Sequence, residues 1–311
     1  MRHHNVPITT FENLDNRLQG NVDQANAAFW STLAGSVLAE SLGVRDFSPE
    51  SLARFDRGYF DYYPYLLQYV DLTTLSGKKV VEIGLGYGSL GQRMVEAGAD
   101  YTGLDVAAGP VRLLNHRLRS RNLPGQAIQG SMLQCPLPSG TFDRVISIGC
   151  FHHTGDVQRC LDETYRVLKP GGTAVIMVYN LLSYRQWRRW PRQTLRSFWR
   201  DLVSSDGMRR GNDEQRLAYD HADEGRKAAP ETMFLSIRQL RRMFQRFTDV
   251  EVHKENCNGL CYQLNFRIPR NEQRASSRRI SMRVDLYWER EKLLRLLGKS
   301  LGLDLYAVAR K

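Results

Sequence analysis

The chain has 311 residues, of which 42% are hydrophobic, and a formal net charge of +11. This hydrophobic fraction is enough for a buried core and argues against global disorder, and no apolar run approaches the roughly 18 to 20 residues that cross a bilayer. Because no apolar signal region follows the first residues, we expect a cytoplasmic protein without a transmembrane segment.

The positive charge is compatible with a nucleic-acid partner but does not establish one. The five cysteines are scattered, and only Cys257 and Cys261 lie near one another. A lone CxxxC pair is a weak signal for a metal site. We therefore expect free thiols and no bound metal.

Residues 1–76 are expected to form an N-terminal helical cap. Residues 1–22 are polar, which is typical of a loosely held arm. Between residues 24 and 42 apolar side chains recur at helical spacing, and Ser48 followed by Pro49 indicates another helix start.

An aromatic cluster follows in residues 55–69 and includes Tyr62 and Tyr63. It can pack the cap against the core, or part of it can close over an active site.

A strand, a tight turn and a helix are predicted at residues 78–91. The apolar run of the strand carries Glu82 and leads into Gly84, Gly86 and Gly88. Such a turn aims backbone N–H groups and a positive helix end at a ligand, and glycine lets the ligand approach the backbone. Taken alone, the glycine spacing also fits a dinucleotide site, with Asp105 near the expected distance.

Residues 81–88 closely resemble motif I of class I S-adenosylmethionine-dependent methyltransferases, an acidic residue followed by x-G-x-G-x-G. An acid inside the strand has no role in a dinucleotide site, whereas the resemblance implies that Glu82 organises the turn and the cationic methionine end of the cofactor. A second strand ends on Asp105, whose carboxylate can accept hydrogen bonds from both ribose hydroxyls. The resemblance places Asp105 in that role and Val106 against the adenine.

The third and fourth strands supply further cofactor contacts by the same resemblance. Ser131 stands where many relatives have an aspartate for the adenine amino group, and a hydroxyl or a backbone carbonyl could substitute there. Met132 could pack on the ring. Gly149 and Cys150, after the fourth strand, would lie beside the transferable methyl group.

The segment from Cys150 to Asp156 resembles the L-H-H-x-x-D signature of the type 11 group, which includes quinone-biosynthesis enzymes. His152 and His153 can be structural, bonding backbone at the strand exit, or one can be a general base. A metal pair is not expected, since adjacent residues in a strand point to opposite faces. Tyr62 and Tyr63 are further candidates for the base.

The sequence L-K-P-G-G at residues 168–172 predicts a turn before a fifth strand. The motifs occur in order at family spacing, so residues 77–180 are identified as a methyltransferase core. The resemblance implies an α/β fold: a Rossmann-like, doubly wound, seven-stranded and mostly parallel sheet with an antiparallel last strand, the N-terminal cap, and an insertion after strand 5. The implied cofactor is S-adenosyl-L-methionine.

Residues 181–247 form a basic aromatic insertion and the penultimate helix, which Ser236 caps. The Arg/Trp-rich stretch 184–200 could clamp RNA, lie on an anionic membrane surface, or cover the active site as a helix pair with arginines outward and aromatics inward, the interpretation we favour. Residues 205–229 predict a loop, where the acidic island at residues 220–224 is expected to be solvated rather than a metal site.

Residues 248–311 should complete the core. A sixth strand is predicted at residues 250–253 and an antiparallel seventh at residues 303–311. Between them, residues 258–268 could form an extra strand or hairpin, and residues 286–297 a basic amphipathic helix.

The expected activity is methyl transfer by in-line displacement to an O, N or C nucleophile of a small molecule, of the secondary-metabolite or lipid-like kind. The fourth strand lacks the N-P-P-Y/F ending of nucleic-acid amino-methylating enzymes. Two alternatives remain: an RNA-modifying methyltransferase that uses the Arg/Trp-rich stretch, and a catalytically inactive cofactor-binding interaction module.

Overall fold

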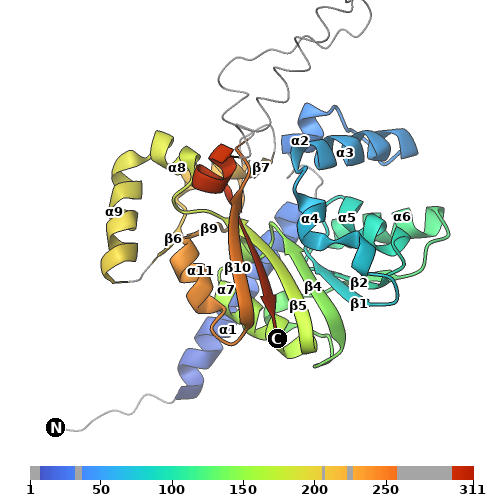
Figure 1. Cartoon of the computed structure of the whole chain (residues 1–311), viewed down its shortest axis with the longest axis horizontal. Helices are drawn as coiled ribbons and strands as arrows, with labels where there is room; N and C mark the ends of the chain where they lie inside the picture. Colours follow the sequence, from blue (N-terminus) through green and yellow to red (C-terminus); the bar gives the residue numbers. More distant parts are fainter. Residues whose placement is uncertain (1–7, 32–36, 205–206, 223–226, 258–295) are drawn as a thin grey trace, which may run out of the picture.

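The computed structural model of the chain describes residues 8–31, 37–204, 207–222, 227–257 and 296–311. A seven-stranded sheet forms its centre, with the strand order β10-β11-β5-β4-β1-β2-β3 (Figure 1). In chain order these strands are β1 (Lys79–Ile83), β2 (Asp100–Asp105), β3 (Gln126–Gln129), β4 (Phe142–Ile148), β5 (Leu168–Tyr179), β10 (Thr248–Glu255) and β11 (Asp304–Arg310).

The strand directions confirm the predicted doubly wound sheet. The five strands that are adjacent in the sheet in the order β3-β2-β1-β4-β5 all pair in parallel. Strand β11 runs antiparallel to both of its neighbours, β5 and β10. The chain passes from β1 outward to β2 and β3 and then returns to β4 on the other side of β1. Ligands of such sheets bind at the carboxyl ends of the strands where this reversal occurs.

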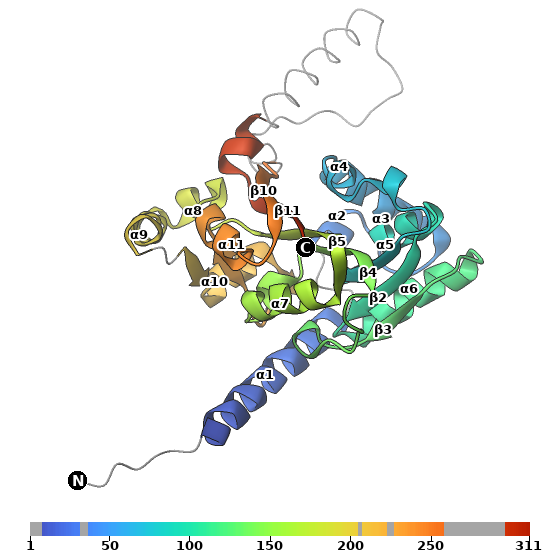
Figure 2. The ribbon, with the colours of Figure 1, turned by 60° about the horizontal axis from the view of Figure 1, so that its bottom comes forward.

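Helices cover both faces of the sheet, so its strands are apolar on both sides (Figure 2). On one face lie α4 (Leu66–Val70), α5 (Ser89–Glu96) and α6 (Ala108–Ser120), and on the other lie α7 (Val157–Val167) and α11 (Ile237–Met243). Val80 packs with the first set and Val81 with the second, because successive strand residues point to opposite faces.

The N-terminal region is more helical than expected. It contains α1 (Ile8–Ser31), α2 (Val37–Ser41) and α3 (Pro49–Tyr62), so the loose arm predicted for residues 1–22 is wrong from Ile8 onward. The prediction relied on the polar composition of these residues and overlooked the helical spacing of Phe11, Leu14, Leu18 and Val22. The start of α3 is confirmed, since the Ser48 hydroxyl accepts a hydrogen bond from the Ser51 N–H and Pro49 opens the helix.

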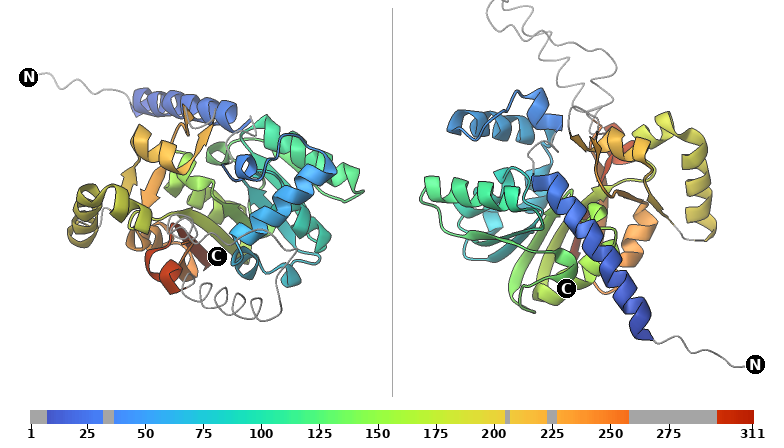
Figure 3. Two further views of the ribbon diagram at one scale, coloured as in Figure 1. Left: turned by 90° about the horizontal axis from the view of Figure 1, so that it is seen from above. Right: turned by 180° about the vertical axis from the view of Figure 1, so that it is seen from behind.

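The long helix α1 crosses the back of the molecule, as the right-hand view of Figure 3 shows. Its C-terminal half contacts α6. The single helix predicted over residues 24–42 is thus divided between α1 and α2.

The insertion after β5 is also more structured than predicted. Its elements are α8 (Tyr184–Arg189), α9 (Pro191–Val203), β6 (Met208–Arg210), α10 (Asp213–Tyr219), β7 (His221–Ala222), β8 (Lys227–Ala228) and β9 (Met233–Leu235). The loop predicted at residues 205–229 is therefore wrong. A capping box starts α10, in which Asn212 and Gln215 exchange side-chain to backbone hydrogen bonds.

The turn predicted at residues 168–172 lies inside β5. Phe142 of β4 pairs with Leu168 of β5, and Arg144 of β4 pairs with Thr173. Because β4 advances by two residues while β5 advances by five, the intervening residues of β5 bulge. The Gly171 N–H donates to the Lys311 carbonyl, which ties the bulge to the end of β11. A proline and two glycines suit this irregular strand start as well as a turn.

The predicted sixth and seventh strands are confirmed as β10 and β11. The hairpin or strand expected at residues 258–268 lies outside the described residues, as does most of the helix expected at residues 286–297; residues 296–301 are helical. Within the described part of the chain, no helix combines the length and the apolar character that crossing a membrane requires.

Candidate functional site

A pocket opens at the carboxyl ends of the central strands, where the strand order reverses. Four segments that follow β1, β2, β3 and β4 meet there, and one side is formed by α1. The pocket is lined by Asp23, Asn26, Trp30, Ile83, Gly84, Gly86, Tyr87, Leu104, Asp105, Val106, Pro110, Gly130, Ser131, Met132, Ile148, Gly149, Cys150, His153 and Thr154.

The glycine turn after β1 forms the floor of this pocket. Gly84, Gly86 and Gly88 have φ values of 81°, 49° and 74°, a region that side chains rarely adopt. A Cβ on Gly84 would lie 2.5 Å from the Cys150 Cβ, whereas a Cβ on Gly86 would meet nothing within 4 Å. Gly84 thus lets the turn touch the end of β4, and Gly86 leaves its backbone open toward a ligand. Gly88 does not line the pocket; it precedes α5 as its N-cap.

Asp105 ends β2 with its carboxylate at the pocket wall. One oxygen accepts from the Leu85 N–H and the other from the Ala107 N–H, each at 2.8 Å. Burial raises the pKa of Asp105 to about 6, although both backbone hydrogen bonds oppose that shift. Each carboxylate oxygen keeps a further lone pair, so this orientation is fixed and the group can still accept from a ligand.

Glu82 lies beneath the turn rather than at the pocket surface. It is buried, and its Oε2 accepts a 2.5 Å hydrogen bond from the Tyr101 hydroxyl. Burial raises the pKa of Glu82 to about 8. A Cβ on Gly91 would come within 2.7 Å of the same carboxylate, so Glu82 packs between β2 and α5 and supports the turn from below.

Three predicted contacts lie together on the wall formed by the ends of β2 and β3. Val106, Ser131 and Met132 all line the pocket. The Gln129 side chain donates to the Val106 carbonyl, and the Ser131 hydroxyl accepts from the Leu133 N–H at 3.2 Å. The wall is therefore held by hydrogen bonds, with a methionine and a valine as its apolar surface.

The two histidines follow β4 in a short 3₁₀ turn (Phe151–His153) rather than in a strand. Their rings lie on the same side, with centroids 4.2 Å apart. Our expectation that they point to opposite faces was wrong because it assumed strand geometry. His153 lines the pocket, whereas His152 is fully buried and its ring nitrogens hydrogen-bond to no described residue. Burial lowers the pKa of His152 well below its usual value.

The His153 ring is held by contacts from the insertion. Its Nδ1 lies 2.7 Å from the Glu231 carbonyl oxygen, and because that oxygen can only accept, Nδ1 carries the proton. Nε2 lies 3.6 Å from an Asp220 carboxylate oxygen. The Tyr179 hydroxyl donates to the same carboxylate at 2.9 Å. Asp220, expected in a solvated loop, is instead a mostly buried partner of the site.

Helix α1 supplies site residues that the sequence did not identify. The Asn26 amide donates to the His153 carbonyl at 2.7 Å, and the Trp30 ring lies 5.1 Å from the His153 ring. The sequence predicted a helix with an apolar face containing Trp30, but no motif indicated which part of the fold this face contacts.

Tyr62 and Tyr63 lie outside the pocket lining. Their rings contact one another, and Tyr63 also packs against Tyr59 and Tyr65. Burial raises the pKa of Tyr63 well above its usual value. A catalytic role for either hydroxyl stays a prediction.

The described residues contain no group of three or more metal-ligating side chains suited to hold an ion. Among them, Cys135, Cys150, Cys160 and Cys257 are free cysteines; Cys261 lies outside the described residues. Burial raises the pKa of the Cys150 thiol, which argues against a reactive thiolate in the pocket.

Comparison with known proteins matches residues 81–176 to a family model described as a methyltransferase domain. The uncharacterized methyltransferase YdaC of Bacillus subtilis is 33% identical over 102 residues, which are 32% of this chain and 55% of that protein. Demethylmenaquinone methyltransferase of Thermus thermophilus is 30% identical over 104 residues, 33% of this chain and 47% of that protein. The chain spans about half the length of these curated relatives.

Among solved structures, the chain is similar to Haemonchus contortus phosphoethanolamine N-methyltransferase 2 in complex with S-adenosyl-L-methionine. The TM-score is 0.49 at 18% identity, over 86% of this chain and 60% of that one. The matched segment of our chain, residues 81–176, contains the glycine turn, Asp105 and both histidines. This segment is thus similar to a methyltransferase domain, which agrees with the resemblance that the sequence motifs indicated.

Proposed function

We propose that the protein transfers a methyl group from S-adenosylmethionine to an O–H or N–H group of a small molecule. The observation that carries the proposal is the meeting of the glycine turn, Asp105 and His153 in one pocket. The glycine turn and Asp105 are suited to bind a nucleoside, and His153 is suited to accept a proton.

The pocket residues fit the cofactor. Gly86 leaves open backbone beside the pocket, and Asp105 holds a fixed carboxylate for a ribose diol. Val106 and Met132 supply an apolar surface for the adenine, with Ser131 beside them. Gly149 and Cys150, at the end of β4, would then lie nearest the methyl group. Glu82, beneath the turn, would act on the methionine end only through the turn that it supports.

When bound, the cofactor would supply a sulfonium-activated methyl group: the acceptor atom would attack the methyl carbon in line with the carbon–sulfur bond, and S-adenosylhomocysteine would leave. His153 is the residue best suited to take the acceptor's proton. Because its Nδ1 donates to the Glu231 carbonyl, the neutral ring carries its lone pair on Nε2. Asp220, 3.6 Å from Nε2, would stabilise the imidazolium that results.

A small acceptor is favoured by the enclosure of the pocket. Helix α1 closes one side with Asn26 and Trp30, and the insertion holds His153 from the other. A base in the pocket favours an acceptor that loses a proton on transfer, hence oxygen or nitrogen rather than an already nucleophilic carbon.

The test is transfer of a labelled methyl group from S-adenosylmethionine to small molecules of a cell extract. We expect labelled product with the wild type, and loss of that product in Asp105→Ala. Asp100→Ala is the matched control, because Asp100 lies at the exposed far end of the same strand. Tight cofactor binding without any labelled product would contradict the enzymatic proposal and favour a cofactor-binding interaction module.

A further inference from the structure

Helix α9 buries three short polar side chains and exposes four large apolar ones, whereas an ordinary surface helix turns its apolar side chains inward. The buried residues are Thr194, Ser197 and Asp201. Each is satisfied by the protein: Thr194 donates to the Trp190 carbonyl, Ser197 accepts from an arginine of β6, and Asp201 accepts from the Ser236 hydroxyl. The inner face is therefore fixed by hydrogen bonds, and the apolar face cannot turn inward without breaking them.

The outer face carries a continuous apolar stripe. Leu195, Trp199, Leu202 and Val203 are 47%, 58%, 45% and 82% exposed. They follow one another at steps of four, three and one residue, so they share one side of the helix. They are four of the seven exposed large apolar side chains among the described residues, and such clustering marks an interaction site. The expectation of arginines outward and aromatics inward is confirmed for the arginines of α9 and for the buried Tyr184 and Trp190, and it is wrong for the exposed Trp199.

A row of cations runs beside the stripe. Arg192, Arg196 and Arg200 recur at every fourth residue of α9 and are exposed, whereas the only acid of the helix, Asp201, is buried.

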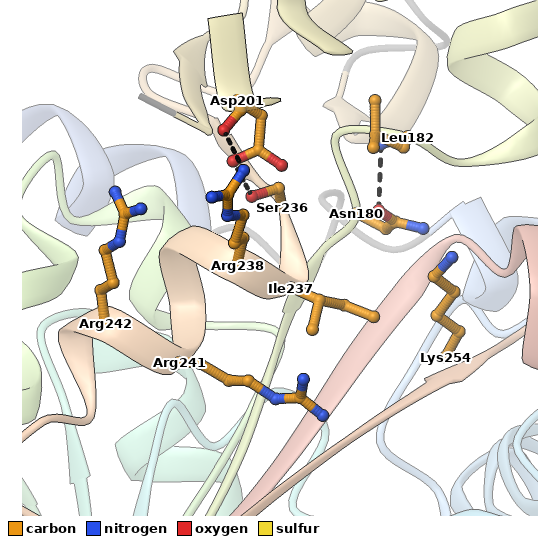
Figure 4. Close-up of a pocket in the computed structure, with 9 residues that line it drawn as sticks. All are labelled: Asn180, Leu182, Asp201, Ser236, Ile237, Arg238, Arg241, Arg242 and Lys254. Atoms are coloured by element: carbon orange, nitrogen blue, oxygen red, sulfur yellow. Dashed lines mark hydrogen bonds between the residues drawn. The ribbon is translucent and has the colours of Figure 1, made fainter. Parts of the chain in front are cut away.

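More cations line an adjoining groove: Arg238 of α11 lies beside Asp201 and Ser236, and Arg241 of α11 and Lys254 of β10 line the groove farther along (Figure 4). Arg238 also donates to the Asp201 and Leu202 carbonyls at the C-terminal end of α9. The surface beside the stripe is thus positive along its length.

We propose that α9 is an interfacial helix that docks the protein on an anionic lipid bilayer. The apolar stripe would enter the boundary between headgroups and acyl chains. Trp199 would lie at the level of the headgroups, where tryptophan is enriched in membrane proteins, and the arginines would contact lipid phosphates. The 13 residues of the helix extend about 20 Å at 1.5 Å per residue. Figures 1 and 2 both place α9 at the periphery, on the opposite side of the molecule from α6, where a flat surface can reach it.

Other occupants fit this surface less well. In a symmetric pair of two copies the same patch meets itself, and the arginine rows would face one another without acids to neutralise them. An RNA strand would use the arginines and Trp199, but Leu195, Leu202 and Val203 offer no ring on which a base can stack. An anionic bilayer offers acyl chains to the apolar stripe and phosphates to the row of arginines.

The test is flotation of the purified full chain with phosphatidylcholine vesicles that contain phosphatidylglycerol. We expect the wild type to float with these vesicles and to remain behind with phosphatidylcholine alone. The triple variant Leu195→Ser/Trp199→Ser/Leu202→Ser should lose vesicle binding at any salt concentration. The double variant Arg192→Glu/Arg196→Glu should bind at least about tenfold more weakly at low salt, since each basic residue near an anionic surface contributes about a fivefold factor.

Two matched variants control for exposed apolar area and for charge. Phe47→Ser removes an apolar side chain that is 44% exposed, and Arg112→Glu/Arg119→Glu reverses two exposed cations of α6. Both should float like the wild type. Circular dichroism should show an unchanged melting transition in every variant, because all the substituted side chains are exposed.

Three results would overturn the proposal. The first is the absence of vesicle binding by the wild type. The second is equal binding by the triple variant and the wild type. The third concerns a wild type that does not bind vesicles: it would either dimerise in a concentration-dependent way or bind RNA in a salt-sensitive way, and the triple variant would lose that property. Cofactor affinity is measured separately on the same samples, so failure of the docking proposal does not depend on the catalytic one.

Discussion

Helices α1 and α9 both lie outside residues 81–176, the segment that carries the sequence motifs, and they bury different kinds of side chain. The C-terminal half of α1 buries Phe29 and Asn26, and it closes one side of the pocket with Asn26 and Trp30. Helix α9 turns Thr194 and Ser197 inward and leaves Leu195 and Trp199 exposed. Two helices with similar mixtures of aromatic and polar residues therefore serve different surfaces, one facing a pocket and one facing outward.

The difference shows that amphipathic spacing alone does not reveal which face of a helix is buried. On α1 the inward direction is set by Asn26, which donates to the His153 carbonyl. On α9 it is set by polar partners of the insertion, such as Arg209 and Ser236. Apolar periodicity locates the helix, and specific hydrogen bonds select its buried side.

The largest effect on activity is expected from substitution of His153, whose backbone carbonyl accepts a hydrogen bond from Asn26 of α1. His153→Ala should lower kcat by at least about 100-fold, since general-base catalysis contributes about 10² to 10⁴. Affinity for S-adenosylmethionine should change by no more than a few-fold. The control is His116→Ala, an exposed histidine of α6. Wild-type kcat in His153→Ala, measured by labelled-methyl transfer, would exclude His153 as the base.

The two tryptophans compare the helices directly. Trp30→Ala on α1 should weaken binding of S-adenosylmethionine by about tenfold, which corresponds to about 1.4 kcal/mol, because it removes a wall of the pocket. Trp199→Ala on α9 should leave that affinity unchanged. Calorimetric titration of both variants checks this. Equal loss of affinity in the two would mean that α1 does not close the cofactor site.

A pH effect should arise at the pocket. The pKa of Asp105 is raised to about 6 from an ordinary value of 3.8, so the carboxylate that would bind the ribose is lost below pH 6. We expect affinity for S-adenosylmethionine to fall by about tenfold from pH 7 to pH 5, following the tenfold change in ionisation per pH unit below the pKa.

The same group should act on stability with the opposite sign. Between pH 3.8 and about 6 the folded state holds a proton on Asp105 that the unfolded state lacks. The contribution of Asp105 to the free energy of unfolding of the cofactor-free protein therefore increases as the pH falls through this window. Asp105→Asn should abolish both pH dependences. A cofactor affinity that is independent of pH between 5 and 7 in the wild type would contradict this role.

The smallest effect is expected from the outer face of α9. Leu195→Ser/Trp199→Ser/Leu202→Ser should leave kcat with a water-soluble acceptor within about twofold of the wild type, and the melting transition nearly unchanged, as is usual for surface substitutions. A large loss of activity in this assay would mean that the outer face of α9 contributes to the catalytic site.

The sheet and the segments that line the pocket could be predicted because their residues obey local rules. Gly84 and Gly86 need positive φ, and Asp105 ends a buried strand, so each position accepts few residue types. The sequence therefore indicated both the family resemblance and the segments that line the pocket.

The acceptor side could not be predicted because it depends on contacts between distant segments. His153 meets Asp220 and Glu231 of the insertion and Asn26 of α1, and no local pattern relates these residues. The short 3₁₀ turn also changed the relative direction of His152 and His153 from what a strand would give. The capping box at Asn212 and Gln215 is a readable local signal for α10, as the apolar spacing of Phe11, Leu14, Leu18 and Val22 is for α1.

Calorimetric titration of the purified chain with S-adenosylmethionine tests the central claim most directly. The account predicts saturable one-to-one binding, at least about tenfold weaker in Asp105→Ala, the equivalent of about 1.4 kcal/mol, and unchanged in Asp100→Ala, at the exposed end of the same strand. Absence of binding by the wild type, or equal affinity in all three proteins, would contradict the assignment of this pocket to the cofactor.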